Sequence, residues 1–498
     1  MYCLKRYFPV LSLLCFFFGF SQENKFLDRG YWQANPSIEQ VEKDIAEGND
    51  PSELNQYAFD AVSYAFLAKA DNKTIKHLLT KEGNDVNKLT HDSRTYIFWA
   101  AYKDNLEMMQ FLVDKGAKTD VVDSHGYSLL NFSAVTGQTN PILYDFILKH
   151  GADVMSETNL AGANALLLVS SFAKDFEIID YFVSKGLSLK NTDNQGYGIL
   201  EYAAKGGNIQ TLKKLMSEGA SFVSENDTRG NAIVTASQGT RGHENTLETY
   251  KFLESQGLNP AAVDASGKNA LHNIAYDVED LAILDYFLLK GTDVNQQDED
   301  GRTPLMNASQ YNSLEVVKLL SSKVADINVV DEEGKTALTM AVIRNHPEVV
   351  AYLLDKGAKA NLKDKKGNNL AYYLVQSYNP KKPDSFEKKL ELLEAKGVSL
   401  ASIQHDGNTL LHLAAKKNNL ALLERLKGLE IPINLKNTDG NTALHLAAMS
   451  ADNDAILKYL IEQGADKTVL TDFDESVFDL ANENELLQEN GITLEFLK

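Results

Sequence analysis

A glycine recurs along the chain at intervals close to 33 residues, each time just before a run of small and apolar residues. It occupies Gly126, Gly162, Gly196, Gly230, Gly267, Gly301, Gly334, Gly367, Gly407 and Gly440. Two earlier units carry Ala58 and Ser93 at the same place, which makes twelve units. A unit this short buries its apolar face only against its neighbours. The spacing therefore predicts one repeat array, although 498 residues would otherwise suggest about three globular domains.

The unit at residues 298–328 shows the local logic of the repeat. Gly301 supplies the positive φ of a tight turn. Thr303 is placed to cap a helix, and Pro304 stands at its first position, where a missing N–H is tolerated. A second apolar stripe with helical spacing follows over residues 314–320. Each unit is therefore expected to be a turn followed by two short helices.

These motifs resemble the ankyrin-repeat family. The matching segments are GRTPLMNA from Gly301, GKTALTMA from Gly334, GNTLLHLAA from Gly407 and GNTALHLAA from Gly440. The resemblance covers about residues 51–471. It implies an all-α solenoid of about twelve helix-turn-helix units with short β-turn or hairpin tips and a binding face formed by the tips and the first helices. The early units depart from the pattern, with YSLLNFSA after Gly126 and YGILEYAA after Gly196.

Both ends of the array are expected to be capped, because a terminal unit has only one neighbour. Residues 22–50 are interpreted as an N-terminal half-repeat in which Pro36 and Ser37 open a single amphipathic helix. Residues 472–498 form the C-terminal capping repeat. Two insertions, at 237–245 and 375–389, fall between paired helices. They are interpreted as surface loops, with a partner contact through Tyr378, Lys381 and Lys382 as the alternative for the second insertion.

The N-terminus has the pattern of a secretory signal peptide over residues 1–21. Lys5 and Arg6 precede an apolar run too short to span a bilayer, and small residues end at Ser21, after which we expect cleavage. An uncleaved apolar helix is an alternative. Acylation at Cys15 is another, but bulky Leu14 precedes it. The expected location is periplasmic or secreted, and the exported chain would then contain no cysteine.

The net charge and the motifs of the chain limit the classes of partner and of site that we expect. The chain has 49 Lys and Arg against 69 Asp and Glu, a net charge of -20, which argues against nucleic acid and anionic membranes and favours a basic protein partner. The GKT at Gly334 lacks the first glycine of a phosphate loop. His272, His412 and His445 share one repeat position and are expected to link neighbouring turns by hydrogen bonds. No catalytic, metal or cofactor site is expected, and the chain is interpreted as non-enzymatic.

Candidate partner-binding residues are those that the repeat leaves free at the tips: Tyr127, Tyr197, Asp298, Glu299, Asp300, Arg302, Glu332, Glu333, Lys365 and Lys366. Exposed tyrosines are good interface anchors, and aligned acidic tips would attract a basic partner over long range. The leading hypothesis is an exported protein-interaction scaffold. The family resemblance implies two alternatives: an immunity protein that inhibits a basic toxin, or an accessory factor of an exported peroxide-removing haem enzyme.

Overall fold

The computed structural model describes residues 24–222 and 231–498. The expected signal peptide, its cleavage point after Ser21, and Gly230 lie outside the described residues. Contacts divide the chain into two compact units, Met1–Gly196 and Tyr197–Lys498, called unit 1 and unit 2.

Unit 1 is built from pairs of short antiparallel helices, preceded by a 3-10 turn at Lys25–Leu27. Within each pair the odd-numbered helix is the first and the even-numbered helix the second. The pairs are α1 (Arg29–Gln33) with α2 (Ile38–Ala46), α3 (Ala61–Ala68) with α4 (Asn72–Leu78), α5 (Tyr96–Tyr102) with α6 (Leu106–Asp114), α7 (Leu129–Val135) with α8 (Pro141–Lys149), and α9 (Ala165–Ser170) with α10 (Glu177–Ser184).

Unit 2 continues the same construction. Its pairs are α11 (Ile199–Gly206) with α12 (Ile209–Ser217), α13 (Ala232–Ala236) with α14 (Leu247–Ser255), α15 (Ala270–Ile274) with α16 (Leu281–Leu289), α17 (Pro304–Tyr311) with α18 (Leu314–Ser321), α19 (Ala337–Arg344) with α20 (Pro347–Asp355), α21 (Leu370–Gln376) with α22 (Pro383–Ala395), α23 (Leu410–Lys416) with α24 (Leu420–Arg425), α25 (Ala443–Ser450) with α26 (Ala455–Glu462), and α27 (Val477–Glu483) with α28 (Glu485–Glu489).

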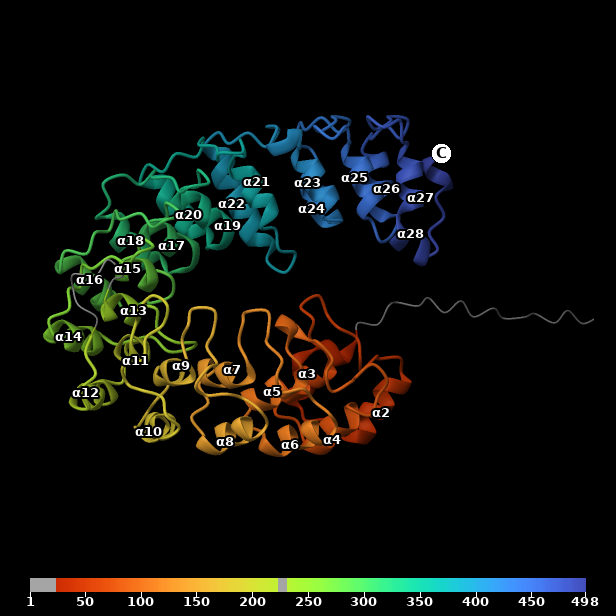
Figure 1. Ribbon diagram of the computed structural model, residues 1–498. Coiled ribbons are helices and arrows are strands. Elements are labelled where there is room, and N and C mark those ends of the chain that lie inside the picture. Colours follow the sequence, from red (N-terminus) through yellow and green to blue (C-terminus); the bar gives the residue numbers. More distant parts are fainter. Residues whose placement is uncertain (1–23, 223–230) are drawn as a thin grey trace, which may run out of the picture. The chain divides into compact units, whose positions relative to one another are not determined.

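Within each unit the pairs stack in chain order, first helix on first helix and second on second (Figure 1). The first helices are short and nearly buried all round, as in α17, where Leu305 and Ala308 are at most 2% exposed. Among the described residues there are no β-strands, only isolated bridges such as Val122 with Ser128 that close the tips. None of the helices in the described ranges is both long enough and apolar enough to cross a bilayer. The expected all-α repeat fold is confirmed.

Two local expectations need correction. The N-terminal cap contains two helices rather than one, because Asp28 caps a short α1 whose Trp32 is fully buried. The insertion at 375–389 is only partly a loop: Pro383 starts α22, which runs for 13 residues, so much of the inserted sequence lengthens a helix. The insertion at 237–245 does form the connection between α13 and α14.

The tips are fixed by turn hydrogen bonds and by contacts with the next tip. Oδ1 of Asp298 accepts hydrogen bonds from the backbone N–H groups of Asp300 (3.1 Å) and Arg302 (2.8 Å). The carbonyl of Asp300 accepts a hydrogen bond of 2.8 Å from the N–H of Glu332 in the next tip. Gly301 has φ +73°, and a Cβ there would lie 2.8 Å from that same nitrogen. The glycine is therefore required both by its own conformation and by the neighbouring tip.

The buried histidines act as expected. In each of His272, His412 and His445, Nδ1 accepts a hydrogen bond from the backbone N–H of the residue that caps the start of its own helix. Nε2 then carries the proton and donates it to a carbonyl in the next repeat, 3.1, 3.0 and 2.9 Å away. Burial lowers the pKa of all three side chains, which keeps them neutral. Each neutral ring therefore ties one helix start to the following tip.

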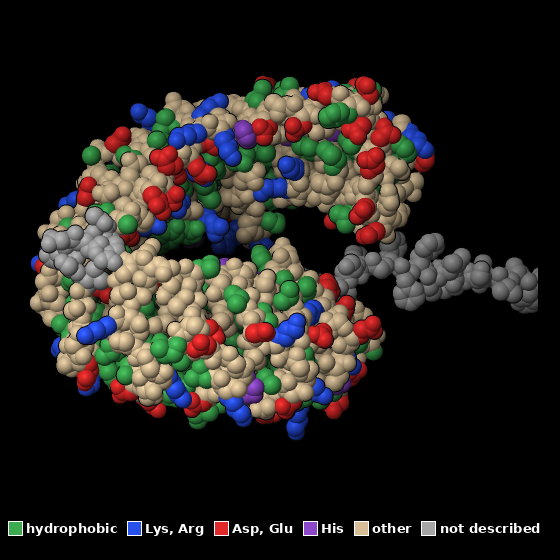
Figure 2. Space-filling view, in the orientation of Figure 1, with side chains coloured by type: hydrophobic (Ala, Val, Ile, Leu, Met, Phe, Trp, Pro, Cys, Tyr) green, Lys and Arg blue, Asp and Glu red, His purple; other side chains and the backbone are tan. Residues whose placement is uncertain are grey.

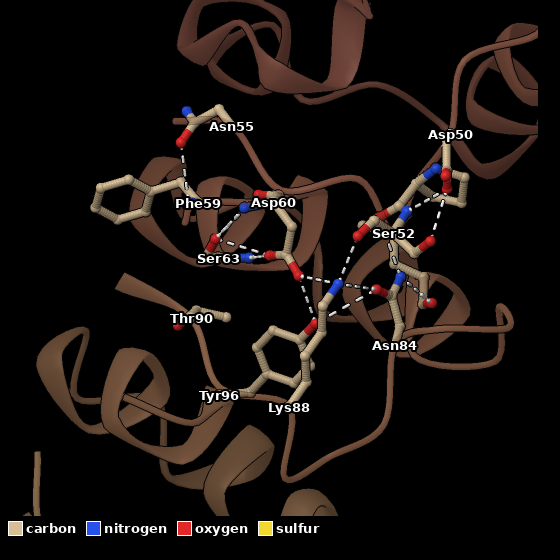
Figure 3. A network of polar contacts seen from close by, with 12 residues as sticks. Asp50, Ser52, Asn55, Phe59, Asp60, Ser63, Asn84, Lys88, Thr90 and Tyr96 are labelled. Carbon is tan, nitrogen blue, oxygen red and sulfur yellow. Dashed lines mark hydrogen bonds and ion pairs between the residues drawn. The ribbon is translucent and has the colours of Figure 1, made fainter. Parts of the chain in front are cut away.

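Unit 1 uses a charged version of this cap, shown in Figure 3. Asp60 replaces the usual threonine at the start of α3 and is fully buried. Its carboxylate accepts hydrogen bonds from the backbone N–H of Ser63 (2.9 Å) and the hydroxyl of Tyr96 (2.6 Å), and pairs with Nζ of Lys88 at 2.9 Å. Burial raises the pKa of Tyr96, so its hydroxyl remains a donor. The buried charge of Asp60 is thus fully compensated.

The tip geometry predicts unequal effects of two glycine substitutions. Gly367 has φ +88° but no atom within 4 Å of an added Cβ, so Gly367→Ala adds conformational strain alone. We expect Gly367→Ala to lower the free energy of unfolding by about 1–2 kcal/mol and Gly301→Ala by about 2–4 kcal/mol, because the second change also pushes two tips apart. Urea unfolding followed by circular dichroism measures both values. Equal losses would contradict the proposed contact between tips.

Candidate protein-interaction surface

In unit 2, large side chains occupy the ends of three successive first helices. Tyr276 follows α15, Tyr311 is the last residue of α17, and Arg344 is the last residue of α19. At these positions the helix has passed its buried turns and its last side chains reach solvent. Tyr311 is 46% exposed, Arg344 is exposed, and Tyr276 is half-buried.

Direct contacts join these side chains into one row. The rings of Tyr276 and Tyr311 stack with centroids 4.9 Å apart. The guanidinium of Arg302 donates to the hydroxyl of Tyr276 at 3.2 Å and to Oε1 of Gln310 at 3.0 Å. The guanidinium carbon of Arg344 lies 5.7 Å from the centroid of the Tyr311 ring. Tyr276, Arg302, Tyr311 and Arg344 are called the Tyr/Arg row.

The composition of this row suits protein recognition. Tyr and Arg are enriched among the residues that dominate binding energy at interfaces, because they combine large apolar area with polar groups at their ends. Stacking and cation–π contacts hold the row in place before any partner arrives, which reduces the entropy lost on binding. The row is therefore the best-organised candidate contact surface in unit 2.

Sequence reasoning identified only Arg302 of this row. Tyr276, Tyr311 and Arg344 were missed because all three fall outside the repeat signature. Their spacing of 35 and 33 residues was a detectable signal, since it matches the repeat length.

The acidic tip residues are less available than expected. Asp298 is 7% exposed, and its carboxylate is used by its own turn. Glu332 pairs with Lys365 at 3.4 Å. Glu333 pairs with Lys335, which lowers the pKa of the glutamate. Figure 2 shows acidic and basic side chains interspersed over the face in view.

Glu299 and Asp300 remain as exposed acidic residues of one tip, and neither has an ion pair among the described residues. Lys366 is exposed on its own tip. Tyr127, in unit 1, is half-buried, and its backbone closes the turn with Asp123. Tyr197, at the start of unit 2, is also half-buried. The predicted residues therefore lie in both units and on several tips of unit 2, and their role in binding stays a prediction.

An apolar residue just before the turn is exposed in several tips, a feature that sequence reasoning also missed. In unit 1 these residues are Leu54, Leu89 and Val122, which are 41%, 57% and 55% exposed. In unit 2 they include Val330 and Ile403, at 44% and 53%. Single exposed apolar residues are common on protein surfaces. Their shared position in the repeat makes the tips a second candidate contact surface.

Across residues 24–222 and 231–498, no group of three or more His, Cys, Asp or Glu side chains is placed to hold a metal ion.

Comparison with known proteins places these features in context. A family model described as ankyrin repeats (three copies) matches residues 63–157, 271–364 and 368–471, which together make up more than half of the chain.

One similar protein is a putative ankyrin repeat protein of Rickettsia felis. It is 23% identical over 277 residues, which cover 50% of this chain and 70% of that protein. Ankyrin repeat protein nuc-2 of Neurospora crassa is 28% identical over 182 residues, 36% of this chain and 16% of the relative. Probable palmitoyltransferase AKR2 of Saccharomyces uvarum is 24% identical over 195 residues, 32% of this chain and 27% of the relative. The chain spans less than a third of the last two proteins.

Proposed function

Because the chain belongs to the ankyrin-repeat family, we propose that it is a non-enzymatic scaffold that binds a protein partner through the Tyr/Arg row of unit 2 and the adjoining tips. Ankyrin repeats are in general protein-interaction modules, which supports the class of function. The single observation that supports the position of the site is the ordered stacking of Tyr276, Tyr311 and Arg344 across three repeats.

We further propose that the scaffold works outside the cytoplasm, in the periplasm or the medium. The support is the sequence pattern of residues 1–21, with a basic start, an apolar run and a small residue at Ser21. Mass spectrometry of the native protein should find Gln22 at the N-terminus. A protein that retains Met1, or that is acylated at Cys15, would contradict cleavage after Ser21.

The partner-binding proposal is tested with a pair of matched variants. Tyr311→Ala with Arg344→Ala removes a cation–π pair from the first-helix face. Tyr352→Ala with Lys356→Ala removes a similar pair, with Nζ 5.5 Å from the ring centroid, at the end of the second helix α20. The partner is first captured with the wild-type protein as bait and then purified. Its dissociation constant is then measured for the wild type and for both double variants.

We expect the first double variant to weaken binding by about 30-fold or more, as truncation of interface hot spots costs at least about 2 kcal/mol. The second double variant should bind as the wild type does. Equal effects of the two variants would argue against the Tyr/Arg row as the contact surface.

The salt dependence of the association rate separates the proposed site from the acidic alternative. A basic partner, such as the toxin of an immunity pair, would depend on Glu299 and Asp300, the exposed acids of one tip. Its association rate would fall steeply between low and physiological salt, and Glu299→Lys with Asp300→Lys would slow it further. A partner held by the Tyr/Arg row should associate at a rate that depends little on salt.

A further inference from the structure

A cavity of about 780 Å³ lies in unit 2, between the junction of α19 with α20 and the connection from α21 to α22. The second of these walls is formed by the insertion at 375–389, so the extra residues create the cavity. Its volume falls within the range of small-molecule sites.

The charge of the lining is opposite to that of the whole chain. Arg344, His346, Lys382 and Lys389 line the cavity, and no Asp or Glu does so. The chain as a whole carries a net charge of -20. A lining of this kind favours an anionic ligand.

Lys389 is the most unusual member of this group. It is only 5% exposed, and its Nζ donates one hydrogen bond of 2.9 Å to the carbonyl of Val342. An ammonium has three donors, and no carboxylate within the described part of the chain pairs with this one. Burial of the unpaired charge lowers the pKa of Lys389 to about 8. The side chain is thus still mainly charged at pH 7 and lacks a counter-ion.

Lys88 in unit 1 shows how this protein ordinarily accommodates a largely buried lysine. Its Nζ pairs with Asp60 at 2.9 Å and also donates to the carbonyl of Ser52 at 2.6 Å and to Oδ1 of Asn84 at 3.3 Å. Among the described residues, Lys389 makes only one such contact, the hydrogen bond to the carbonyl of Val342. Buried charges are normally paired, so an anionic ligand would supply the partner that the described residues do not give Lys389.

Part of the remaining lining is aromatic. Tyr372 and Tyr378 are half-buried, and the rings of Tyr378 and Phe386 meet edge to face with centroids 5.1 Å apart. These rings offer a flat apolar surface beside the buried ammonium. A small apolar group next to a single negative charge would use both features.

We propose that this cavity binds a carboxylate attached to an aromatic or aliphatic group, with Lys389 as the buried counter-charge and Arg344 as a second cation at the surface. A monoanion matches the single buried ammonium better than a phosphate, whose three oxygens need more donors than the buried part of the site supplies. The carboxylate comes either from a free small molecule or from the C-terminus of a peptide.

Calorimetric titration tests the proposal with two acids and their neutral amides. Benzoate is compared with benzamide, and the peptide acetyl-Ala-Ala-Phe with a free carboxylate is compared with the same peptide as its amide. For at least one acid we expect binding about tenfold or more tighter than for its amide, since a charge-assisted hydrogen bond is lost with the charge. Benzoate binding identifies a free small molecule as the source, and binding of the peptide acid alone identifies a chain terminus.

Two substitutions locate the effect at Lys389. Lys389→Met keeps the volume and removes the charge, so it should abolish the preference for acid over amide. Ser385→Glu places a carboxylate one helical turn before Lys389, on the same cavity wall, where residues four apart are neighbours. It should raise the melting temperature and block binding of the acid. Ser385→Gln, the neutral control, should do neither.

The proposal is overturned if neither acid binds the wild-type protein more tightly than its amide, or if Lys389→Met retains that preference. It is also overturned if Ser385→Glu and Ser385→Gln have the same melting temperature and the same affinity for the acid. The Ser385 pair keeps the test decisive even if Lys389→Met proves poorly folded.

Discussion

Two short helices cannot enclose a core, and all the described α-helices except α22 are shorter than ten residues, so each described pair depends on the pair or pairs next to it. The dependence extends from side chains to backbone. Leu305 and Ala308 of α17 are buried in the stack, and the tip at Asp300 accepts a hydrogen bond from the tip that contains Glu332. The residues that make these contacts are therefore fixed by stacking, and positions at helix ends and in the connections are left for other roles.

The two candidate sites in unit 2 occupy such positions. The Tyr/Arg row stands where first helices end, and its members contact one another across repeats that are already aligned by the core. The cavity around Lys389 arises where an insertion lengthens α22 and the connection that precedes it. In both cases the repeat supplies rigid spacing, and residues that lie mostly outside the repeat signature supply the chemistry.

Sequence reasoning recovered what is periodic. The spacing of glycines such as Gly301, the capping threonines and the linking role of His412 all follow from one repeat and were confirmed by the structure. It failed to find contacts between residues of neighbouring repeats that are 26 to 47 positions apart and are not part of the repeat signature. Lys389 meets the carbonyl of Val342, and Arg302 meets Tyr276, through the stacking itself. The burial of Asp298 was missed because its carboxylate serves its own turn, whereas its charge suggested exposure.

In the function proposed above, a partner contacts the first-helix face and tips of unit 2. Hydrogen exchange followed by mass spectrometry, with and without the purified partner, tests this most directly. Binding should slow hydrogen exchange at the ends of α15, α17 and α19 and in the tips beside them. Exchange in the second helices α18 and α20 should not change. Protection confined to α18 and α20, with none at the ends of α17 and α19, would contradict it.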